Sequence, residues 1–137
     1  MKPAVDSSVA IAAFASWHAL HEQASQIVNR GASLPAHAAF ETFSVLTRLP
    51  EPTRASPRRV SQFLADAFAD EWLTLPGSSL AGLVREFAER GIRGGATYDA
   101  LIGATARAAG SLLVTCDRRA VATYERLGLK VEVLEAG

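Results

Sequence analysis

Short apolar runs alternate along the chain with longer stretches of helical periodicity. Apolar runs of four or so residues bounded by turn residues are typical of buried strands, and apolar residues spaced three and four apart are typical of helices. This alternation predicts an α/β fold, a three-layer α/β/α sandwich around a parallel sheet of four or five short strands. The expected strands are Pro3–Val5, Ser33–Ala36, Trp72–Leu75, Ser111–Thr115 and Lys130–Leu134.

Helices are expected between these strands, and turn residues mark their ends. Ser56 is a serine cap followed by a proline at the first helical position. Thr97 is an expected cap for a later helix, which Gly110 closes. The expected helices are Val9–Phe14, Ala19–Asn29, His37–Leu49, one beginning at Ser56–Pro57, one from Ser78 or Ser79 to about Arg90, one from Thr97 to Gly110, and one from Asp117 to Gly128.

The stretch Gly94–Tyr124 organises the candidate site. It is predicted to form a loop, a helix, a buried strand and a second helix, with Asp99 in the first helical turn and Asp117 after the strand. In a right-handed strand–helix–strand unit, helices that lead into a parallel strand start at the edge where strands end. Asp99 and Asp117 are therefore expected at one rim, where open α/β sheets bind ligands.

Two further acids are expected at the same rim. Asp6 directly follows the first strand, and Glu41 lies in the early turns of the third helix. Each has an ordinary local explanation: Asp6 as a helix cap or a carboxylate satisfied by the neighbouring serines, and Glu41 as an acid favoured by the helix dipole. Four carboxylates converging at one rim would repel one another unless a cation lay between them. A hard divalent ion with oxygen ligands, Mg²⁺ or Mn²⁺, is the natural occupant.

Length and composition indicate one globular domain, 1–137. Hydrophobic residues make up 49% of the chain and charged residues 20%, and the formal net charge is +0. Any binding of nucleic acid must therefore come from local patches. The arginines Arg54, Arg58 and Arg59 form one candidate patch, although a solvated face explains Arg58 and Arg59 as well. No apolar run approaches the length that spans a bilayer. We therefore expect a cytoplasmic protein with no membrane association.

Cys116 is the single cysteine of the chain. One cysteine excludes an internal disulfide and a multi-cysteine zinc site. Its position beside Asp117 raises the question of a nucleophile, but a small buried residue of the strand is the better interpretation.

Four segments, each containing one acid, together resemble the PIN-domain ribonucleases, and specifically the VapC-type toxins of bacterial toxin–antitoxin pairs. The resemblance implies the strand order 3-2-1-4-5, a ribonuclease that uses Mg²⁺ or Mn²⁺, and the metal-binding and catalytic acids Asp6, Glu41, Asp99 and Asp117. It also implies a VapB-type antitoxin, an RNA substrate and a homodimer, with Ser8 and Thr115 orienting carboxylates or water. The segments are VDSSV (5–9), AAFETFSVLTRL (38–49), GGATYDALIGATA (94–106) and LLVTCDRRAVATYERLGLKV (112–131).

The chain departs from many relatives at Arg119, where a further acid is common, which puts a second bound metal in question. Other classes fit less well. A haloacid-dehalogenase-type phosphatase would have an aspartate where this chain has Ser8, and a response-regulator receiver would have a lysine at the rim, whereas Lys130 begins a strand. A metal-dependent phosphatase of another α/β family and a non-catalytic PIN-like module that only binds a partner protein remain as alternatives.

Overall fold

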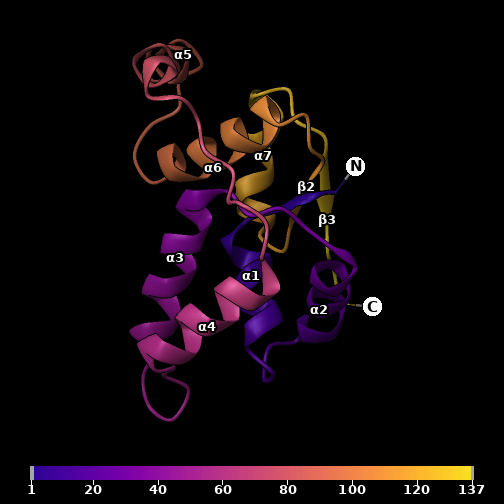
Figure 1. Cartoon of the computed structure of the whole chain (residues 1–137). Helices are drawn as coiled ribbons and strands as arrows, with labels where there is room; N and C mark the ends of the chain where they lie inside the picture. The colour runs from indigo at the N-terminus through magenta and orange to yellow at the C-terminus, as the bar shows by residue number, and fades with distance from the viewer. Residues whose placement is uncertain (1, 137) are drawn as a thin grey trace.

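Three short parallel strands form the centre of the sheet in the computed structural model, which describes residues 2–136. Figure 1 shows helices above and below these strands. The elements are β1 (Ala4–Val5), α1 (Ser7–Phe14), α2 (His21–Arg30), α3 (Ala36–Thr47), α4 (Pro57–Ala67), a 3₁₀ turn (Gly77–Ser79), α5 (Leu80–Glu89), α6 (Ala96–Ala108), β2 (Leu113–Thr115), α7 (Arg118–Arg126) and β3 (Val131–Val133).

The order of the paired segments is the one that the family resemblance implies. β1 pairs with β2 and β2 with β3, all parallel. Parallel bridges from Ala4 to Ser33 and from Pro35 to Leu73 continue the sheet on the other side of β1. Counted in chain order, the five segments therefore lie 3-2-1-4-5, and that prediction is confirmed.

Two expected strands are reduced to isolated bridges, a correction to the prediction for Ser33–Ala36 and Trp72–Leu75. Pro35 has no N–H group and cannot donate to a ladder. The backbone still pairs around it, since the Val5 N–H donates to Ser33 O at 3.0 Å and the Leu73 N–H to Leu34 O at 2.9 Å. The backbone on this side of β1 is therefore hydrogen-bonded, but the paired segments are too short to be regular strands.

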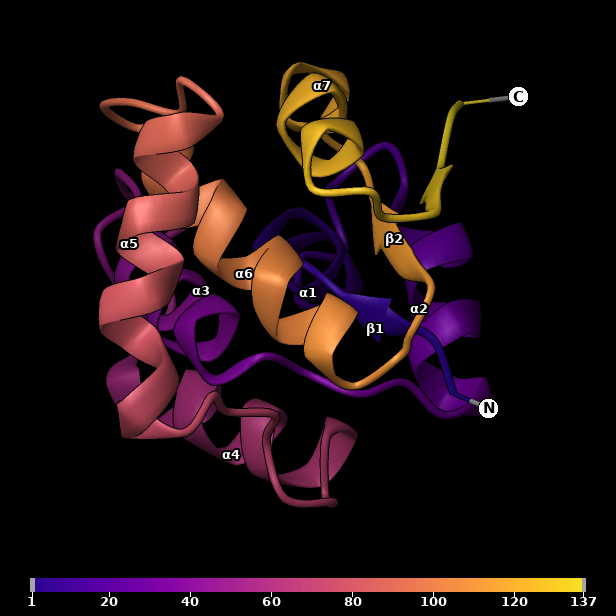
Figure 2. The ribbon, with the colours of Figure 1, turned by 90° about the horizontal axis from the view of Figure 1, so that it is seen from above.

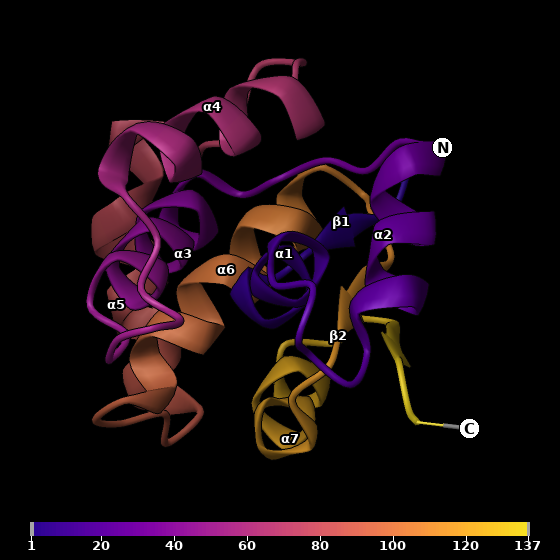
Figure 3. The same ribbon diagram turned by 90° about the horizontal axis from the view of Figure 1, so that it is seen from below.

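Helices cover both faces of the sheet, which makes the fold the predicted three-layer α/β/α sandwich. Seen from above, α5, α6 and α7 lie toward the viewer (Figure 2), and from below α1 lies between α2 and α3 (Figure 3). This division follows from right-handed crossovers, because the chain builds the sheet first to one side of β1 and then to the other. No helix within residues 2–136 is long and apolar enough to cross a membrane.

The apolar core has two parts. The larger part lies around the sheet and contains the buried side chains of β1, β2 and α1 together with Leu34, Leu46 and Tyr124. The smaller part lies under α5, where Phe87 packs with Ile92, Ala100 and Leu127. α5 is thus attached to α6 through a separate small core at the edge of the molecule.

Two helix caps differ from the prediction. α6 begins at Ala96 with Gly95 as its N-cap and no capping side chain, so Thr97 is not the cap. α5 begins after the 3₁₀ turn, and its N-cap Ser79 makes no side-chain cap bond; its hydroxyl donates to Pro76 O at 2.7 Å. In both cases the residue before the helix already has helical backbone angles, whereas a capping side chain needs an extended backbone at that position. The predicted Ser56 cap is present, accepting from the Arg59 N–H at 3.2 Å.

Candidate active site

Asp6 caps α1 and is almost completely buried, with 3% of its surface exposed. Its Oδ1 accepts from the Ser8 hydroxyl at 2.5 Å and from the Val9 N–H at 3.3 Å. Burial raises the pKa of Asp6, and hydrogen bonds, first among them that from Ser8, oppose the rise. Both local explanations from the sequence, the cap and the serine-bound carboxylate, are therefore present together.

Tyr124 is a contact of Asp6 that the sequence analysis missed. Its hydroxyl donates to the second oxygen, Oδ2, at 2.7 Å across 118 positions of the chain. The side chain is fully buried, and burial followed by the charge of Asp6 raises the pKa of the phenol. The available signal was its position on the apolar face of α7, but that pattern equally describes a tyrosine packed in the core.

Glu41 lies in the second turn of α3 and contacts the start of α1 and the start of its own helix. Its Oε1 accepts from the Ser7 hydroxyl, at the start of α1, at 3.0 Å. Its Oε2 lies 3.3 Å from Nε2 of His37, one turn earlier in α3. That nitrogen is buried and makes no hydrogen bond, so the two side chains are in contact without one.

Asp117 is held where β2 leads into α7. It caps α7 by accepting from the Arg119 N–H at 3.0 Å, and the Arg119 guanidinium Nε lies 3.3 Å from the same oxygen. The Asp117 N–H in turn donates to the Thr115 hydroxyl at 3.0 Å. Arg119 is therefore a cationic neighbour of the last acid.

Ser8 connects the ends of β1 and β2. Besides donating to Asp6, its hydroxyl accepts from the Cys116 N–H at 2.7 Å and lies 3.3 Å from the Thr115 hydroxyl. Ser8 and Thr115, the two expected positioning residues, thus contact Asp6 and Asp117 respectively and also approach each other. One hydroxyl pair sets the separation of the two strand ends that carry these acids.

Asp99 connects the four acids electrostatically. It lies in the first turn of α6. Burial, followed by the charges of Glu41, Asp117 and Asp6 in that order, raises its pKa to about 6, against a smaller opposing effect of Arg119. The four predicted acids, from separate parts of the chain, are therefore near enough to act on one another.

The contacts of the acids are nevertheless with protein groups. No three His, Cys, Asp or Glu side chains within residues 2–136 are already gathered as a metal site. Asp6 faces Ser8 and Tyr124, and Asp117 faces Arg119. The donor set still fits a hard cation, since all four groups are oxygen ligands and their mutual repulsion is largely uncompensated at Asp99. Their role as metal ligands stays a prediction.

Cys116 lies just beyond β2 and is half-buried, so the expectation of a buried strand residue is only partly met. Burial, followed by the charge of Asp6, raises the pKa of its thiol to about 11. A thiol with that pKa carries almost no thiolate at neutral pH, which argues against a nucleophile.

The three candidate substrate-binding arginines lie away from the acids. They follow the C-terminal end of α3, and the helix rises roughly 9 Å from Glu41 to Thr47. Arg54 donates to Leu49 O at 2.7 Å, and the Arg59 guanidinium lies 5.7 Å from the ring centre of Phe14, whereas Arg58 is exposed. Contact of these side chains with substrate stays a prediction, and it requires an RNA that extends along α3.

Comparison with known proteins identifies the family. The family model described as PIN domain matches residues 4–126. The chain belongs to the PIN domain family. Within it, the chain is 53% identical over 131 residues to Ribonuclease VapC40 of Mycobacterium tuberculosis, covering 96% of this chain and 98% of that protein, in the strains CDC 1551 / Oshkosh and H37Rv alike. It is 41% identical over 136 residues to Ribonuclease VapC27 of the H37Rv strain, covering 97% and 98%.

The PIN match spans all the segments that build the site. Residues 4–126 run from β1 to the end of α7 and include the four acids, Ser8, Thr115 and Tyr124. The near-complete coverage of the VapC proteins extends this similarity through β3. The chain is thus a VapC-type PIN protein over almost its whole length.

Proposed function

We propose that this PIN domain protein is a toxin-type endoribonuclease that hydrolyses RNA phosphodiester bonds with the help of Mg²⁺ or Mn²⁺. The observation that carries the proposal is the pKa of Asp99, raised to about 6 by burial and by three other acids from different elements. A fold that keeps uncompensated carboxylates together at the sheet rim gains from a cation there. The names of the similar VapC proteins, both ribonucleases, agree with that chemistry.

The four acids Asp6, Glu41, Asp99 and Asp117 are the residues that would hold the cation. When bound, a divalent ion supplies a water of lowered pKa and positive charge for the phosphoryl oxygens. The protein contributes orientation: Ser8 and Tyr124 fix the two oxygens of Asp6, Thr115 fixes the backbone of Asp117, and Ser7 holds Glu41. Such supporting hydrogen bonds commonly determine metal affinity as much as the ligands do.

The first test is Asp6→Asn. Asparagine keeps an oxygen for the Ser8 and Val9 donors, and the Tyr124 hydroxyl can rotate to accept from the new amide, so the fold should tolerate the change. We expect cleavage of RNA in Mg²⁺ to fall by at least about 100-fold, with a melting temperature near that of the wild type. Unfolding of the variant would instead make Asp6 a structural cap only.

A second arm of the same assay separates the alternatives. Wild-type protein with Mg²⁺ or Mn²⁺ should cleave RNA, and a chelator should stop it. A protein that binds a partner but cleaves no RNA with either ion would favour the non-catalytic module, and release of phosphate from small phosphoesters without cleavage of RNA would favour a phosphatase. Sequencing the 5′ ends of the products would identify which RNA is cut.

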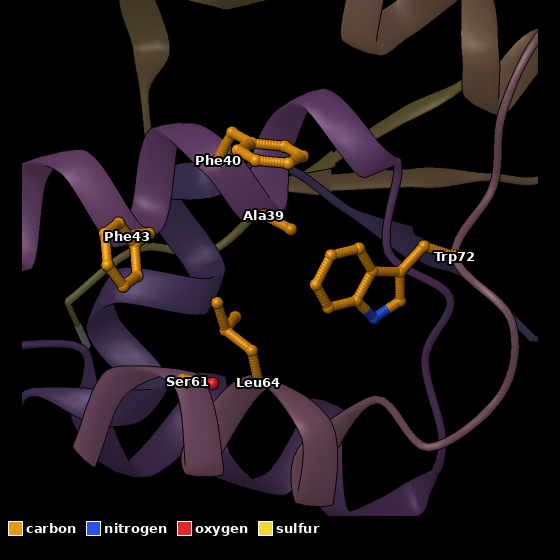
Figure 4. A pocket seen from close by; sticks show the side chains of 6 residues that line it. All are labelled: Ala39, Phe40, Phe43, Ser61, Leu64 and Trp72. Carbon is orange, nitrogen blue, oxygen red and sulfur yellow. The ribbon is translucent and has the colours of Figure 1, made fainter. Parts of the chain in front are cut away.

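We further propose that a VapB-type antitoxin binds across α3 and α4. Figure 4 shows an apolar pocket of about 250 Å³ in which Phe40 and Phe43 of α3 lie across from Leu64 of α4, with Trp72 closing one side. Phe40 is 70% exposed and is followed in sequence by Glu41. Glu41 lies on a neighbouring face of α3, so a peptide that continues from this pocket around α3 would bring an arginine or lysine to the acids, where it would compete with the cation.

Co-purification with the product of the adjacent small reading frame tests this partner. Phe40→Ala should weaken the complex, and Trp17→Ala, which removes a similarly exposed side chain outside the pocket, should not. Rising Mg²⁺ should restore cleavage if a basic side chain occupies the acids, and tight binding without loss of cleavage would exclude that mode of inhibition. Light scattering of the isolated protein measures the predicted homodimer.

A further inference from the structure

Two aromatic rings stack beside the acids. His37 in α3 and Tyr98 in α6 have ring centres 5.4 Å apart and planes inclined by only 8°. At that separation nearly parallel rings are offset-stacked. His37 lies one turn before Glu41, and Tyr98 immediately precedes Asp99. The stack therefore joins the starts of two helices that each carry one of the acids.

The outer ring of this stack is open to solvent. Tyr98 is 54% exposed although it is a large aromatic residue in the first turn of a helix. Since His37 covers one face of the phenol ring, the exposed surface belongs mainly to the other face and the edge. A rigid, solvated aromatic face beside a polar site is the kind of surface on which a planar ligand stacks.

Because of the protein's charge, such a surface would add to its affinity for RNA. The net charge is +0, and the carboxylates themselves repel phosphates. Affinity for RNA must then come partly from contacts that do not depend on charge. Stacking of bases on aromatic rings is one such contact, and it requires bases that are not already paired.

We propose that Tyr98, supported by His37, is a platform on which one unpaired RNA base stacks, so that the adjoining phosphate lies at the acids. The proposal rests on the proposed ribonuclease function and adds to it a binding site for one base. His37 packs against one face of the Tyr98 ring. Its Nε2 lies 3.3 Å from Glu41 Oε2, which places the platform beside the acids.

The direct test measures binding without cleavage. A short single-stranded RNA with one 2-aminopurine is titrated into protein carrying Asp6→Asn, and the fluorescence of that base reports stacking. Fluorescence should fall on binding. Adding Tyr98→Ala should abolish the fall and weaken affinity roughly 5- to 150-fold, the loss expected for one base–aromatic stack. Tyr98→Phe, which keeps the ring, should restore both within about twofold.

An RNA lacking the base gives an independent check. If Tyr98 contacts that base, an abasic nucleotide at the same position should weaken binding as much as Tyr98→Ala does. The variant and the abasic RNA together should then show little additional loss, because both remove the same contact. Fully additive losses would overturn the platform, as would affinity and fluorescence unchanged by Tyr98→Ala.

Trp17→Ala is the matched control. Trp17 is 55% exposed and lies 6.2 Å from the ring of His18, so it resembles Tyr98 in exposure and in its histidine neighbour. It follows the far end of α1, whereas Asp6 caps the near end. Its removal should leave the fluorescence change intact. If Tyr98→Ala lowers the melting temperature, Tyr98→Leu, which still covers His37, replaces it.

The outcomes separate this proposal from the ribonuclease itself. If the wild type binds the RNA and quenches its fluorescence but does not cleave it, the proposed function is wrong and the platform is supported. Cleavage of an unstructured RNA by Tyr98→Ala with unchanged KM and kcat would overturn the platform and leave the nuclease standing. If Tyr98→Ala instead weakens only the complex with the antitoxin, the ring belongs to the protein partner and the proposal fails.

Discussion

At the scale of single residues, structural and chemical roles coincide at Asp6. The same carboxylate caps α1, accepts hydrogen bonds from two hydroxyls and is predicted to bind the cation. A capping aspartate elsewhere is usually exposed and replaceable, whereas this one is 3% exposed and both of its oxygens have donors. These hydrogen-bond donors stabilise the charged form of Asp6, which burial alone would disfavour.

Tyr124→Phe tests whether this support matters for chemistry. Removing the hydroxyl deprives Asp6 Oδ2 of its 2.7 Å donor, and a lost hydrogen bond to a buried charge destabilises by about 1.5–3 kcal/mol. If Tyr124 positions Asp6, the Mg²⁺ concentration for half-maximal cleavage should rise roughly 10- to 100-fold. A lower melting temperature with an unchanged Mg²⁺ requirement would mean that Tyr124 is a core residue only.

At the scale of elements, the close packing of α6 on α7 depends on Gly103. A Cβ added there would lie 2.9 Å from a methyl of Leu129 and 3.0 Å from the ring of Tyr124. The leucine methyl can rotate away, but the tyrosine ring is fixed by its hydrogen bond to Asp6. Gly103 therefore lets Tyr124 reach the acid.

Gly103→Ala should consequently destabilise the protein by about 0.5–2 kcal/mol, because the cost of overpacking exceeds the gain in helix propensity. Gly82→Ala in α5 is the control: nothing lies within 4 Å of the added Cβ, so it should stabilise by about 0.5–1 kcal/mol. Urea unfolding of both variants measures the difference. Equal effects of the two substitutions would contradict the packing argument.

Helices, strand order and the approximate placement of the acids follow from the sequence, because periodicity and the family resemblance determine them. The caps of α5 and α6 could not be foreseen, since both helices follow a residue with helical backbone angles, which periodicity does not specify. The hydrogen bond from Tyr124 to Asp6 could not be predicted from the sequence either. It depends on how α6 packs on α7, and amphipathic periodicity alone does not specify that packing.

At the scale of the whole molecule, the charge of Asp99 makes the isolated protein sensitive to pH. Its pKa is about 6 in the folded protein against an ordinary 3.8, so between those values the folded state binds the extra proton. The contribution of Asp99 to the free energy of unfolding therefore increases as the pH falls from above 6, and the increase is complete near pH 4. Above pH 6 the charged form weakens the fold.

Asp99→Asn should then raise the melting temperature of the metal-free protein at alkaline pH by roughly 3–10 °C, and the increase should vanish near pH 4. Mg²⁺ should stabilise the wild type more at pH about 8 than at pH about 5, and should stabilise the variant less. Calorimetry with and without the ion measures both effects. A variant destabilised at alkaline pH would show that Asp99 is compensated by its neighbours.

The hydrogen bond that joins Asp6 to a residue 118 positions later also bears on biosynthesis. An unfinished polypeptide that ends before β2 has neither Asp117 nor the tyrosine that holds the first acid, so it cannot assemble the rim. Under the proposed function, a chain that stops before these residues would therefore not cleave RNA. Cleavage would begin only after synthesis has passed Tyr124, and the interval before that point is available for the proposed antitoxin to bind the folding chain.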